Sequence, residues 1–205
     1  MKLLLNIKQL NRTINNEASL GFVPTMGALH NGHLSLIKKS QKLCKKTIVS
    51  IFINRSQFNK KSDYLSYPRN YKNDLQELKK TKIDYLFIPR EKDIFNVKRR
   101  KITKLNNFSK LLCGKFRPRH FYGVVDIVDR FLSIIKAKFI FLGEKDFQQL
   151  VLIQNYIYKK HKTKVVSCKT IRDKNGLALS SRNFLLNNKE KKIGSRVYKF
   201  LLRKS

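Results

Sequence analysis

Short apolar runs alternate with segments of helical periodicity along the chain, and this alternation constrains the fold more than any other feature. The runs that predict strands lie at residues 20–23, 47–53, 85–88, 139–142 and 164–168, the first of them ending at Pro24. Apolar residues recur at helical spacing in residues 33–46, 70–80, 122–135 and 146–158. Strands that alternate with helices of this length indicate βαβ units, so we expect an α/β fold with a parallel sheet.

Residues 23–33, here called the histidine loop, follow the first predicted strand and open a helix. Ligands of parallel sheets lie outside the carboxyl ends of the strands, and a helix N-terminus offers an anion unpaired N–H groups and a partial positive charge. His30 and His33 can therefore both face a phosphate group and stabilise charge that develops on it. The H-x-G-H pattern alone also fits two unrelated surface histidines, but its position between a strand and a helix favours the phosphate site.

Residues 50–58, the amide loop, end the second predicted strand. Asn54 and Gln57 are neutral hydrogen-bonding residues that suit a hydroxy-acid. Taken on its own, this block is more simply interpreted as a pair of ordinary loop amides.

Residues 143–149, the lysine loop, follow the strand at 139–142. Lys145 is a point charge suited to phosphate. Asp146 can accept from ribose hydroxyls or cap the next helix, and Gln149 lies one turn further on. A capped, solvated helix start is the alternative interpretation. Arg117, upstream at the start of another helix, is a further candidate for anion contact.

Residues 171–183, the serine loop, contain the turn signal Asn175-Gly176. Ser180, Ser181 and Arg182 then bring two hydroxyls and a guanidinium group together. Such a loop can close over a triphosphate. The alternative is the start of a helix with Ser180 or Ser181 as its N-cap.

The chain of 205 residues is strongly basic, with 46 Lys and Arg against 13 Asp and Glu and a net charge of +33. A basic surface attracts nucleic acid whatever its sequence. The charges are spread over the whole chain, however, and the abundant Lys, Asn and Ile have A/T-rich codons. We therefore attribute the charge to compositional drift and expect no specific nucleic-acid partner.

The cellular location is expected to be the cytoplasm. The three cysteines are scattered and form no C-x-x-C pair, which favours reduced thiols over a disulfide framework. Asn6 and Lys8 interrupt the apolar start of the chain, so it does not match a secretory signal. No run approaches the roughly 20 apolar residues of a membrane span, and we expect a soluble protein.

The motifs, taken in order, resemble the pantothenate synthetase (pantoate–β-alanine ligase) family. They are P-T-M-G-A-L-H-x-G-H, S-I-F-I-N-x-x-Q-F, Y-P-R, H-F-x-G-V, G-E-K-D-F-Q-Q-L and N-G-L-A-x-S-S-R-N, between about residues 20 and 183. No single motif is decisive, but the ordered set is specific. The resemblance implies ATP-dependent ligation of (R)-pantoate and β-alanine to pantothenate, through a pantoyl-adenylate, with release of AMP and pyrophosphate. Mg²⁺ would accompany ATP, and a homodimer is expected.

The implied fold is a Rossmann-like parallel sheet of the H-x-G-H nucleotidyltransferase superfamily. Residues 1–183 would form the catalytic domain that binds ATP and pantoate. Residues 184–205 would be a remnant of the family's C-terminal lid domain, with one helix at about 189–200. Because a lid protects an acyl-adenylate from water, we expect a leakier or slower enzyme, or no activity.

The resemblance also implies residue roles. His33 would be the catalytic proton donor, with His30 beside it and Lys145 on phosphate, while Asp146 would bind ribose and Ile171 adenine. The nucleotide-binding residues would be Met26, Gly27, His30, His33, Gly143, Glu144, Lys145, Asp146, Ile171, Leu179, Ser180, Ser181 and Arg182. The substrate-binding residues would be Gln57, Gln149, Asn54 and Arg117, with Gln57 and Gln149 on pantoate and Gln57 also on β-alanine. No residue is assigned as a metal ligand.

Three residues near these motifs depart from the family pattern. Arg55 stands where proline is common, Arg119 where glycine is usual, and Asp126 where threonine is expected. They flank the implied site and leave its residues in place.

Two alternative functions remain open at this point. A mononucleotide adenylyltransferase would keep H-x-G-H but would lack the Gln57 and Gln149 pair. A degenerate, inactive remnant with a basic nucleic-acid-binding surface would bind RNA with a steep salt dependence and would not bind ATP.

Overall fold

A computed structural model describes residues 1–15, 17–97 and 105–203. Its centre is a six-stranded sheet in the order β1-β4-β3-β2-β5-β6. Every neighbouring pair of strands is parallel. The strands are β1 (Lys2–Leu4), β2 (Leu20–Thr25), β3 (Lys46–Ile51), β4 (Tyr85–Phe87), β5 (Phe139–Gly143) and β6 (Lys164–Cys168). The expected α/β fold with a parallel sheet is confirmed.

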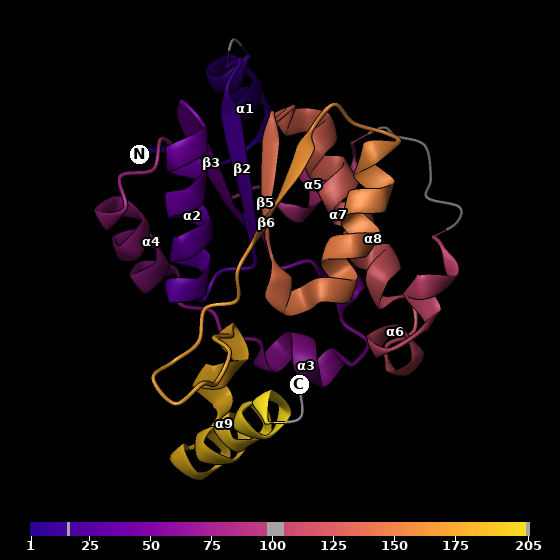
Figure 1. Ribbon diagram of the computed structural model, residues 1–205. Coiled ribbons are helices and arrows are strands. Elements are labelled where there is room, and N and C mark those ends of the chain that lie inside the picture. The colour runs from indigo at the N-terminus through magenta and orange to yellow at the C-terminus, as the bar shows by residue number, and fades with distance from the viewer. Residues whose placement is uncertain (16, 98–104, 204–205) are drawn as a thin grey trace.

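Helices cover both faces of the sheet (Figure 1). They are α1 (Ile7–Ile14), α2 (Asn31–Leu43), α3 (Lys61–Ser66), α4 (Tyr71–Lys80), α5 (Glu91–Phe95), α6 (Cys113–Phe116), α7 (His120–Ile135), α8 (Phe147–Tyr158) and α9 (Asn188–Leu202). Short 3₁₀ turns lie at Arg55–Gln57, Asn107–Lys110, Glu144–Asp146 and Ser181–Leu185.

The core forms two layers because successive strand side chains point to opposite faces. In β2, Phe22 packs with residues of α1, α7 and α8, whereas its neighbour Val23 packs with residues of α2 and α4. Ile48 and Val49 of β3 divide between the two layers in the same way. Burial on both faces explains why these strands are continuously apolar.

The predicted end of the first strand at Pro24 is wrong. The strand continues to Thr25, and Pro24 pairs in register with Ser50 of β3. On its other side, β2 pairs with β5 only at Gly21 and Phe22. Proline is tolerated in a central strand here because its missing N–H falls where one of the two ladders has already ended.

The N-terminal element was not predicted as part of the fold. Residues 2–4 form the edge strand β1, which pairs with β4 through Leu3 and Leu86. Asn6 then caps α1, its side chain accepting the Gln9 N–H. The run that begins like a secretory signal is thus the edge of the sheet.

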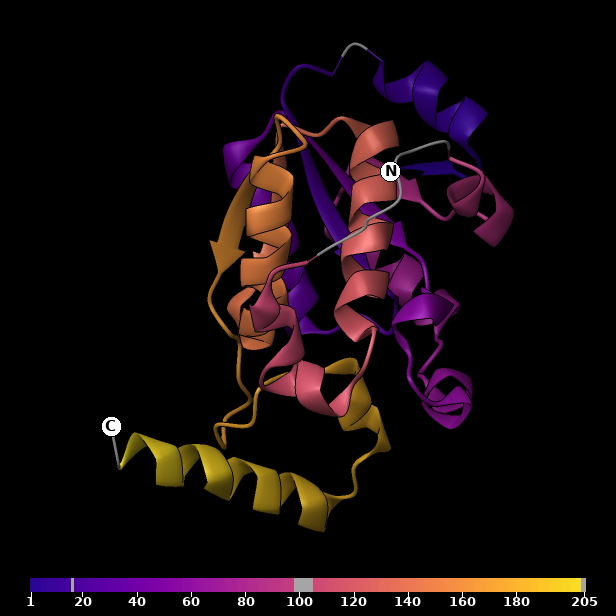
Figure 2. The same ribbon diagram turned by 90° about the vertical axis from the view of Figure 1, so that its right-hand side faces the viewer.

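The last helix, α9, lies beyond the carboxyl-terminal edge of the sheet (Figure 2). It contacts the serine loop, where the Arg172 guanidinium lies 3.4 Å from the centroid of the Tyr198 ring. The division into a catalytic domain and a C-terminal remnant stays a prediction.

Candidate active site

The chain changes direction across the sheet between β2 and β5. From β2 it proceeds to β3 and β4 on one side, and it returns to form β5 and β6 on the other. Such a switch point opens a crevice at the carboxyl ends of the strands. A cavity of about 270 Å³ lies there, close to the lower end of the usual range for small-molecule sites.

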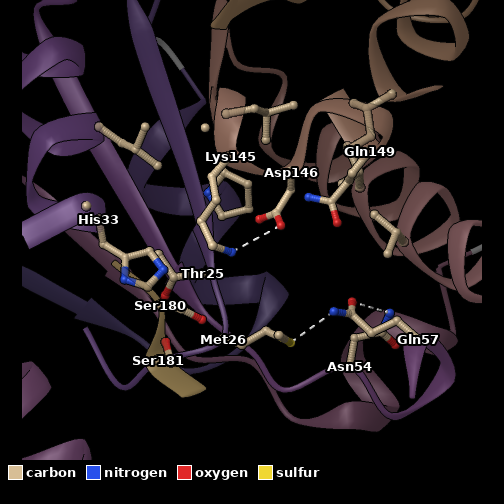
Figure 3. A pocket seen from close by; sticks show the side chains of 18 of the residues that line it. Thr25, Met26, His33, Asn54, Gln57, Lys145, Asp146, Gln149, Ser180 and Ser181 are labelled. Carbon is tan, nitrogen blue, oxygen red and sulfur yellow. Dashed lines mark hydrogen bonds and ion pairs between the residues drawn. The ribbon is translucent and has the colours of Figure 1, made fainter. Parts of the chain in front are cut away.

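All four loops singled out in the sequence meet in this cavity (Figure 3). Among the expected site residues, those that line it are Met26, His30, His33, Asn54, Gln57, Arg117, Gly143, Lys145, Asp146, Gln149, Ile171, Leu179, Ser180, Ser181 and Arg182. Gly27 and Glu144 do not line it. Gly27 makes a turn with φ of 78°, and Glu144 accepts a hydrogen bond from the Ser167 hydroxyl over 3.0 Å.

The two histidines of the histidine loop lie side by side at the start of α2. His30 is the N-cap, and its Nδ1 accepts the Gly32 N–H over 3.1 Å. A Cβ on Gly32 would come within 2.7 Å of the His30 ring, so the loop needs glycine here. The ring centroids of His30 and His33 are 4.1 Å apart.

Both histidines have lowered pKa values, which favours their neutral forms at physiological pH. Burial, followed by the charge of Lys145, lowers the pKa of His30 to about 4. Burial also lowers the pKa of His33 to about 3, with further contributions from His30 and Lys145. The buried Nδ1 of His33 has no partner among the described residues. The pair therefore offers ring N–H donors to an anion, and an arriving anion would favour protonation.

A buried aspartate of α4 holds the histidine loop in place. Asp74 is 1% exposed, and its two carboxylate oxygens accept the Ala28 N–H over 2.8 Å and the Leu29 N–H over 2.7 Å. Ala28 has a positive φ of 49°, a conformation that costs energy for a residue with a side chain. The carboxylate stabilises this turn, although burial still leaves the pKa of Asp74 raised.

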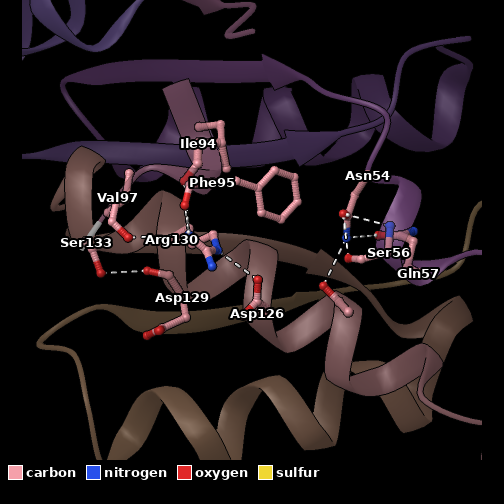
Figure 4. Close-up of polar contacts among 11 residues, drawn as sticks. Asn54, Ser56, Gln57, Ile94, Phe95, Val97, Asp126, Asp129, Arg130 and Ser133 are labelled. Atoms are coloured by element: carbon pink, nitrogen blue, oxygen red, sulfur yellow. Dashed lines mark hydrogen bonds and ion pairs between the residues drawn. The ribbon is translucent and has the colours of Figure 1, made fainter. Parts of the chain in front are cut away.

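The amide loop places one amide in the cavity and uses the other to build the loop. Asn54 is 1% exposed. Its Nδ2 donates to the Gly123 carbonyl and to Gln57 Oε1, and its Oδ1 accepts from Ser56 N and Oγ (Figure 4). Asn54 thus lines the site while protein groups use its hydrogen-bonding atoms. Its expected contact with the substrate stays a prediction.

Gln57 and Gln149 point into the cavity from opposite walls (Figure 3). The Gln57 amide nitrogen lies 3.1 Å from the Met26 sulfur, a weak partner that a ligand can replace. The backbone carbonyl of Gln57 accepts from His120 Nδ1 over 2.6 Å. His120 Nε2 lies 3.4 Å from Arg117 Nη1, so this histidine links the amide loop to Arg117.

The lysine loop brings a cation and a carboxylate to the wall of the cavity. Lys145 Nζ lies 3.2 Å from Asp146 Oδ1. Asp146 occupies the N-cap position of α8, but its side chain makes no capping hydrogen bond. The alternative interpretation as a simple helix cap is therefore not supported, and the carboxylate faces the cavity (Figure 3).

The serine loop forms a short hairpin that ends against the histidine loop. Arg172 and Ala178 pair as an antiparallel bridge, with Gly176 at φ of 96° in the turn. Ser180 caps the following 3₁₀ turn, as one of the two interpretations of the sequence had it. The buried Ser181 hydroxyl donates to the Ala28 carbonyl over 3.0 Å.

The three residues that depart from the family pattern differ in their conformation and contacts. Arg119 has a φ of 63°, a left-handed conformation that glycine adopts without strain. Arg55 lies 5.9 Å from the centroid of the Tyr64 ring. Asp126 accepts from Arg130 Nε over 2.8 Å, and Arg130 Nη1 donates to carbonyls at the carboxyl end of α5, that of Phe95 among them (Figure 4).

Sequence reasoning missed three residues that shape the site: Asp63, Asp74 and His120. Asp63 binds Arg182 across 119 positions of sequence. Asp74 reaches the histidine loop across 46 positions. No local pattern marks either contact, whereas His120 could have been singled out by its place in the H-F-x-G-V motif.

The fold and the site define an α/β enzyme in which an H-x-G-H loop and basic side chains line a cavity at the carboxyl ends of the strands. A family model described as pantoate-β-alanine ligase matches residues 2–205. The chain belongs to this family.

Curated relatives agree with this assignment. The chain is 42% identical to a pantothenate synthetase of Endomicrobium trichonymphae over 98% of its own length and 73% of the relative's. It is 44% identical to one of Francisella philomiragia, over 96% and 77% of the respective lengths.

Solved structures of pantothenate synthetases have the same fold as this chain. The pantoate-β-alanine ligase of Francisella tularensis, crystallised with β-γ ATP and β-alanine, superposes with a TM-score of 0.92 at 42% identity, over 98% of this chain and 79% of that one. The pantothenate synthetase of Thermus thermophilus gives a TM-score of 0.93 at 32% identity, over 98% and 74%. Among the described residues, no helix is long and apolar enough to cross a membrane.

Proposed function

We propose that the chain joins (R)-pantoate to β-alanine at the expense of ATP, with pantoyl-adenylate as the intermediate. The supporting observation is the division of one cavity into two sides. His33 and Lys145 stand on one side, and the uncharged amides of Gln57 and Gln149 face each other on the other. The His30 ring lies 4.1 Å from that of His33 and so belongs to the first side. The family and its solved relative with ATP and β-alanine support the same substrates.

The first half-reaction forms the mixed anhydride. A pantoate carboxylate oxygen attacks the α-phosphorus of ATP in line, the bond from this phosphorus to the bridging oxygen breaks, and pyrophosphate leaves. Gln57 and Gln149 hold pantoate by hydrogen bonds. Lys145 and the neutral histidines stabilise charge on the phosphate oxygens, His33 serving as hydrogen-bond donor to the group in transfer. Ser180, Ser181 and Arg182 receive the pyrophosphate.

The second half-reaction forms the amide. The β-alanine amine attacks the acyl carbon of pantoyl-adenylate, the carbon–oxygen bond to AMP breaks, and the amine loses a proton. Positioning supplies most of the rate enhancement in both steps because no covalent enzyme intermediate is needed.

Magnesium enters this scheme together with ATP. Both oxygens of Asp74 accept backbone N–H groups, and those of Asp63 accept from Arg182. Asp146 is paired with Lys145. The described residues contain no group of three or more His, Cys, Asp or Glu residues placed to hold a metal. Mg²⁺ would therefore be held by phosphate oxygens and water, as it commonly is with nucleotides.

We further propose that the protein is a cytoplasmic homodimer. The family resemblance supports the dimer, and three free cysteines suit a reducing compartment. Light scattering coupled to size-exclusion chromatography would measure the oligomeric state, and a monomeric mass at micromolar concentration would contradict the proposal.

Pyrophosphate release from Mg·ATP tests the function directly. We expect release with D-pantoate alone, stimulation by β-alanine, and pantothenate among the products. Lys145→Ala should slow release by about 10²–10³-fold. The ratio of pyrophosphate to pantothenate tests whether the intermediate leaks to water. No release from folded protein would leave the basic nucleic-acid-binding remnant as the better interpretation.

A further inference from the structure

One carboxylate lies between the two arginines of the cavity. Asp63 of α3 accepts from Arg182 Nε over 3.1 Å and from Arg182 Nη2 over 3.0 and 2.9 Å. Its Oδ2 lies 4.0 Å from Arg117 Nη2. The three residues come from three separate segments, and both arginines line the cavity.

The Arg182 guanidinium is fixed on several sides. It lies 5.2 Å from the centroid of the Tyr67 ring and 5.8 Å from that of Phe58. The bidentate pair with Asp63 uses Nε and Nη2 and sets the plane of the group. Its Nη1 has no hydrogen-bond partner among the residues that the structure describes.

The two arginines repel each other. After burial, the charge of Arg182 is the largest cause that lowers the pKa of Arg117, whereas Asp63 raises it. The carboxylate therefore offsets the repulsion between like charges that share one wall. A polyphosphate chain would bring the same kind of negative charge to the same two groups.

We infer that Asp63 is a positioning residue that orients Arg182 and Arg117 before the triphosphate binds and competes for them with the departing pyrophosphate. The inference rests on the proposed function, because that function places polyphosphate at these arginines. Orientation supports catalysis, since a preformed donor needs no reorganisation during the reaction. Competition weakens the hold on pyrophosphate and so assists its release.

Asp63→Asn removes the charge and keeps the size of the side chain. We expect kcat for pantoate-dependent pyrophosphate release to fall about 10- to 100-fold. Binding of inorganic pyrophosphate, measured by calorimetry, should tighten about 3-fold or more because a competing negative charge is lost. Asp63→Glu should recover part of kcat. A merely structural role would weaken binding and catalysis together, and that result would overturn the inference.

A double-mutant cycle tests whether Asp63 affects catalysis and pyrophosphate binding through Arg182. In an Arg182→Gln background, Asp63→Asn should change kcat and pyrophosphate binding by less than about 3-fold, because residues that act through one another are not additive. Independent, multiplicative effects would contradict the inference.

Asp93→Asn is the matched control. Asp93 forms a similar two-point pair with Arg90 on α5, over 2.9 and 3.2 Å, and it does not line the cavity. This variant should leave kcat and pyrophosphate binding unchanged.

The binding measurement separates the inference from the proposed function. If the wild type binds pyrophosphate with the expected Asp63 dependence but releases none from ATP and pantoate, the function fails and the inference stands. If the wild type does not bind pyrophosphate, the inference fails.

Discussion

Ser181 donates its hydroxyl to the Ala28 carbonyl over 3.0 Å and thereby joins two loops that are 153 positions apart in sequence. The bond connects the turn before the two histidines to the segment expected to receive pyrophosphate. Both ends are buried, with Ser181 4% and Ala28 3% exposed. This hydrogen bond therefore helps to fix the relative position of the two loops.

Ser181→Ala should separate these loops and leave the Ala28 carbonyl without this donor. We expect a loss of about 1–2 kcal/mol in the free energy of unfolding and a higher KM for ATP. Ser195→Ala is a matched control, because the buried Ser195 hydroxyl also donates to a backbone carbonyl, that of Lys191, over 2.9 Å in α9. A control that raises KM equally would contradict the prediction.

Asp74→Asn should loosen the histidine loop. The amide keeps one acceptor but turns an N–H donor toward one of the backbone N–H groups, so we expect a loss of about 1–3 kcal/mol and a fall in kcat/KM for ATP. Denaturant unfolding and initial rates measure the two effects. Asp84→Asn is the comparison, since Asp84 accepts the Thr47 N–H at the amino end of β3. It should lower stability and leave the activity of the folded enzyme unchanged.

Gly123→Ala should displace the amide loop. A Cβ at this position would lie 2.5 Å from the Ser56 carbonyl oxygen and 2.9 Å from the Gln57 nitrogen, both backbone atoms. We expect kcat/KM for pantoate to fall about 10-fold or more, because small displacements of positioning groups are costly. Gly194→Ala should have little effect, since its Cβ would meet only the flexible Leu177 side chain. Unchanged pantoate kinetics would disprove the close-packing argument.

Stability should fall as pH drops from 6.5 toward 4. The folded-state pKa of His33 is lowered to about 3 and that of His30 to about 4, from 6.5. Between these values the unfolded chain binds more protons, so acid favours unfolding. We expect His33 to account for roughly 2 kcal/mol of the loss by pH 4.5. Urea unfolding across this range measures it, and His33→Gln should flatten the curve. If the free energy of unfolding of the variant depends on pH as steeply as that of the wild type, His33 is not the cause of the loss.

The sequence predicted those features of the fold and the site that depend on residues close together along the chain. Runs such as residues 139–142 combine apolar character with the position of a buried strand, and the structure places β5 there. The loops after the strands could be grouped into one site because carboxyl ends of parallel strands share an edge. Residue type then separated the side of the cavity expected to bind phosphate from the side that carries the two glutamine amides.

The remaining features depend on tertiary contacts. Asp63 and Asp74 lie on short helices whose sequences give no sign of the loops they bind. The sequence predicted a substrate contact for Asn54 but gave no sign of its hydrogen bonds with Gly123 and Ser56, which form only in the folded chain. The edge strand β1 was missed because three residues are too few for a periodic pattern.

Pro24 has a consequence for how the cavity stays open. Since proline has no N–H to donate, the main chain of β2 cannot extend its ladder with β5 past Phe22. The missing donor thereby limits backbone hydrogen bonding between β2 and β5 at their carboxyl ends. The ends of both strands line the cavity, so a single covalent feature of the main chain, the ring nitrogen of Pro24, helps to keep this space open.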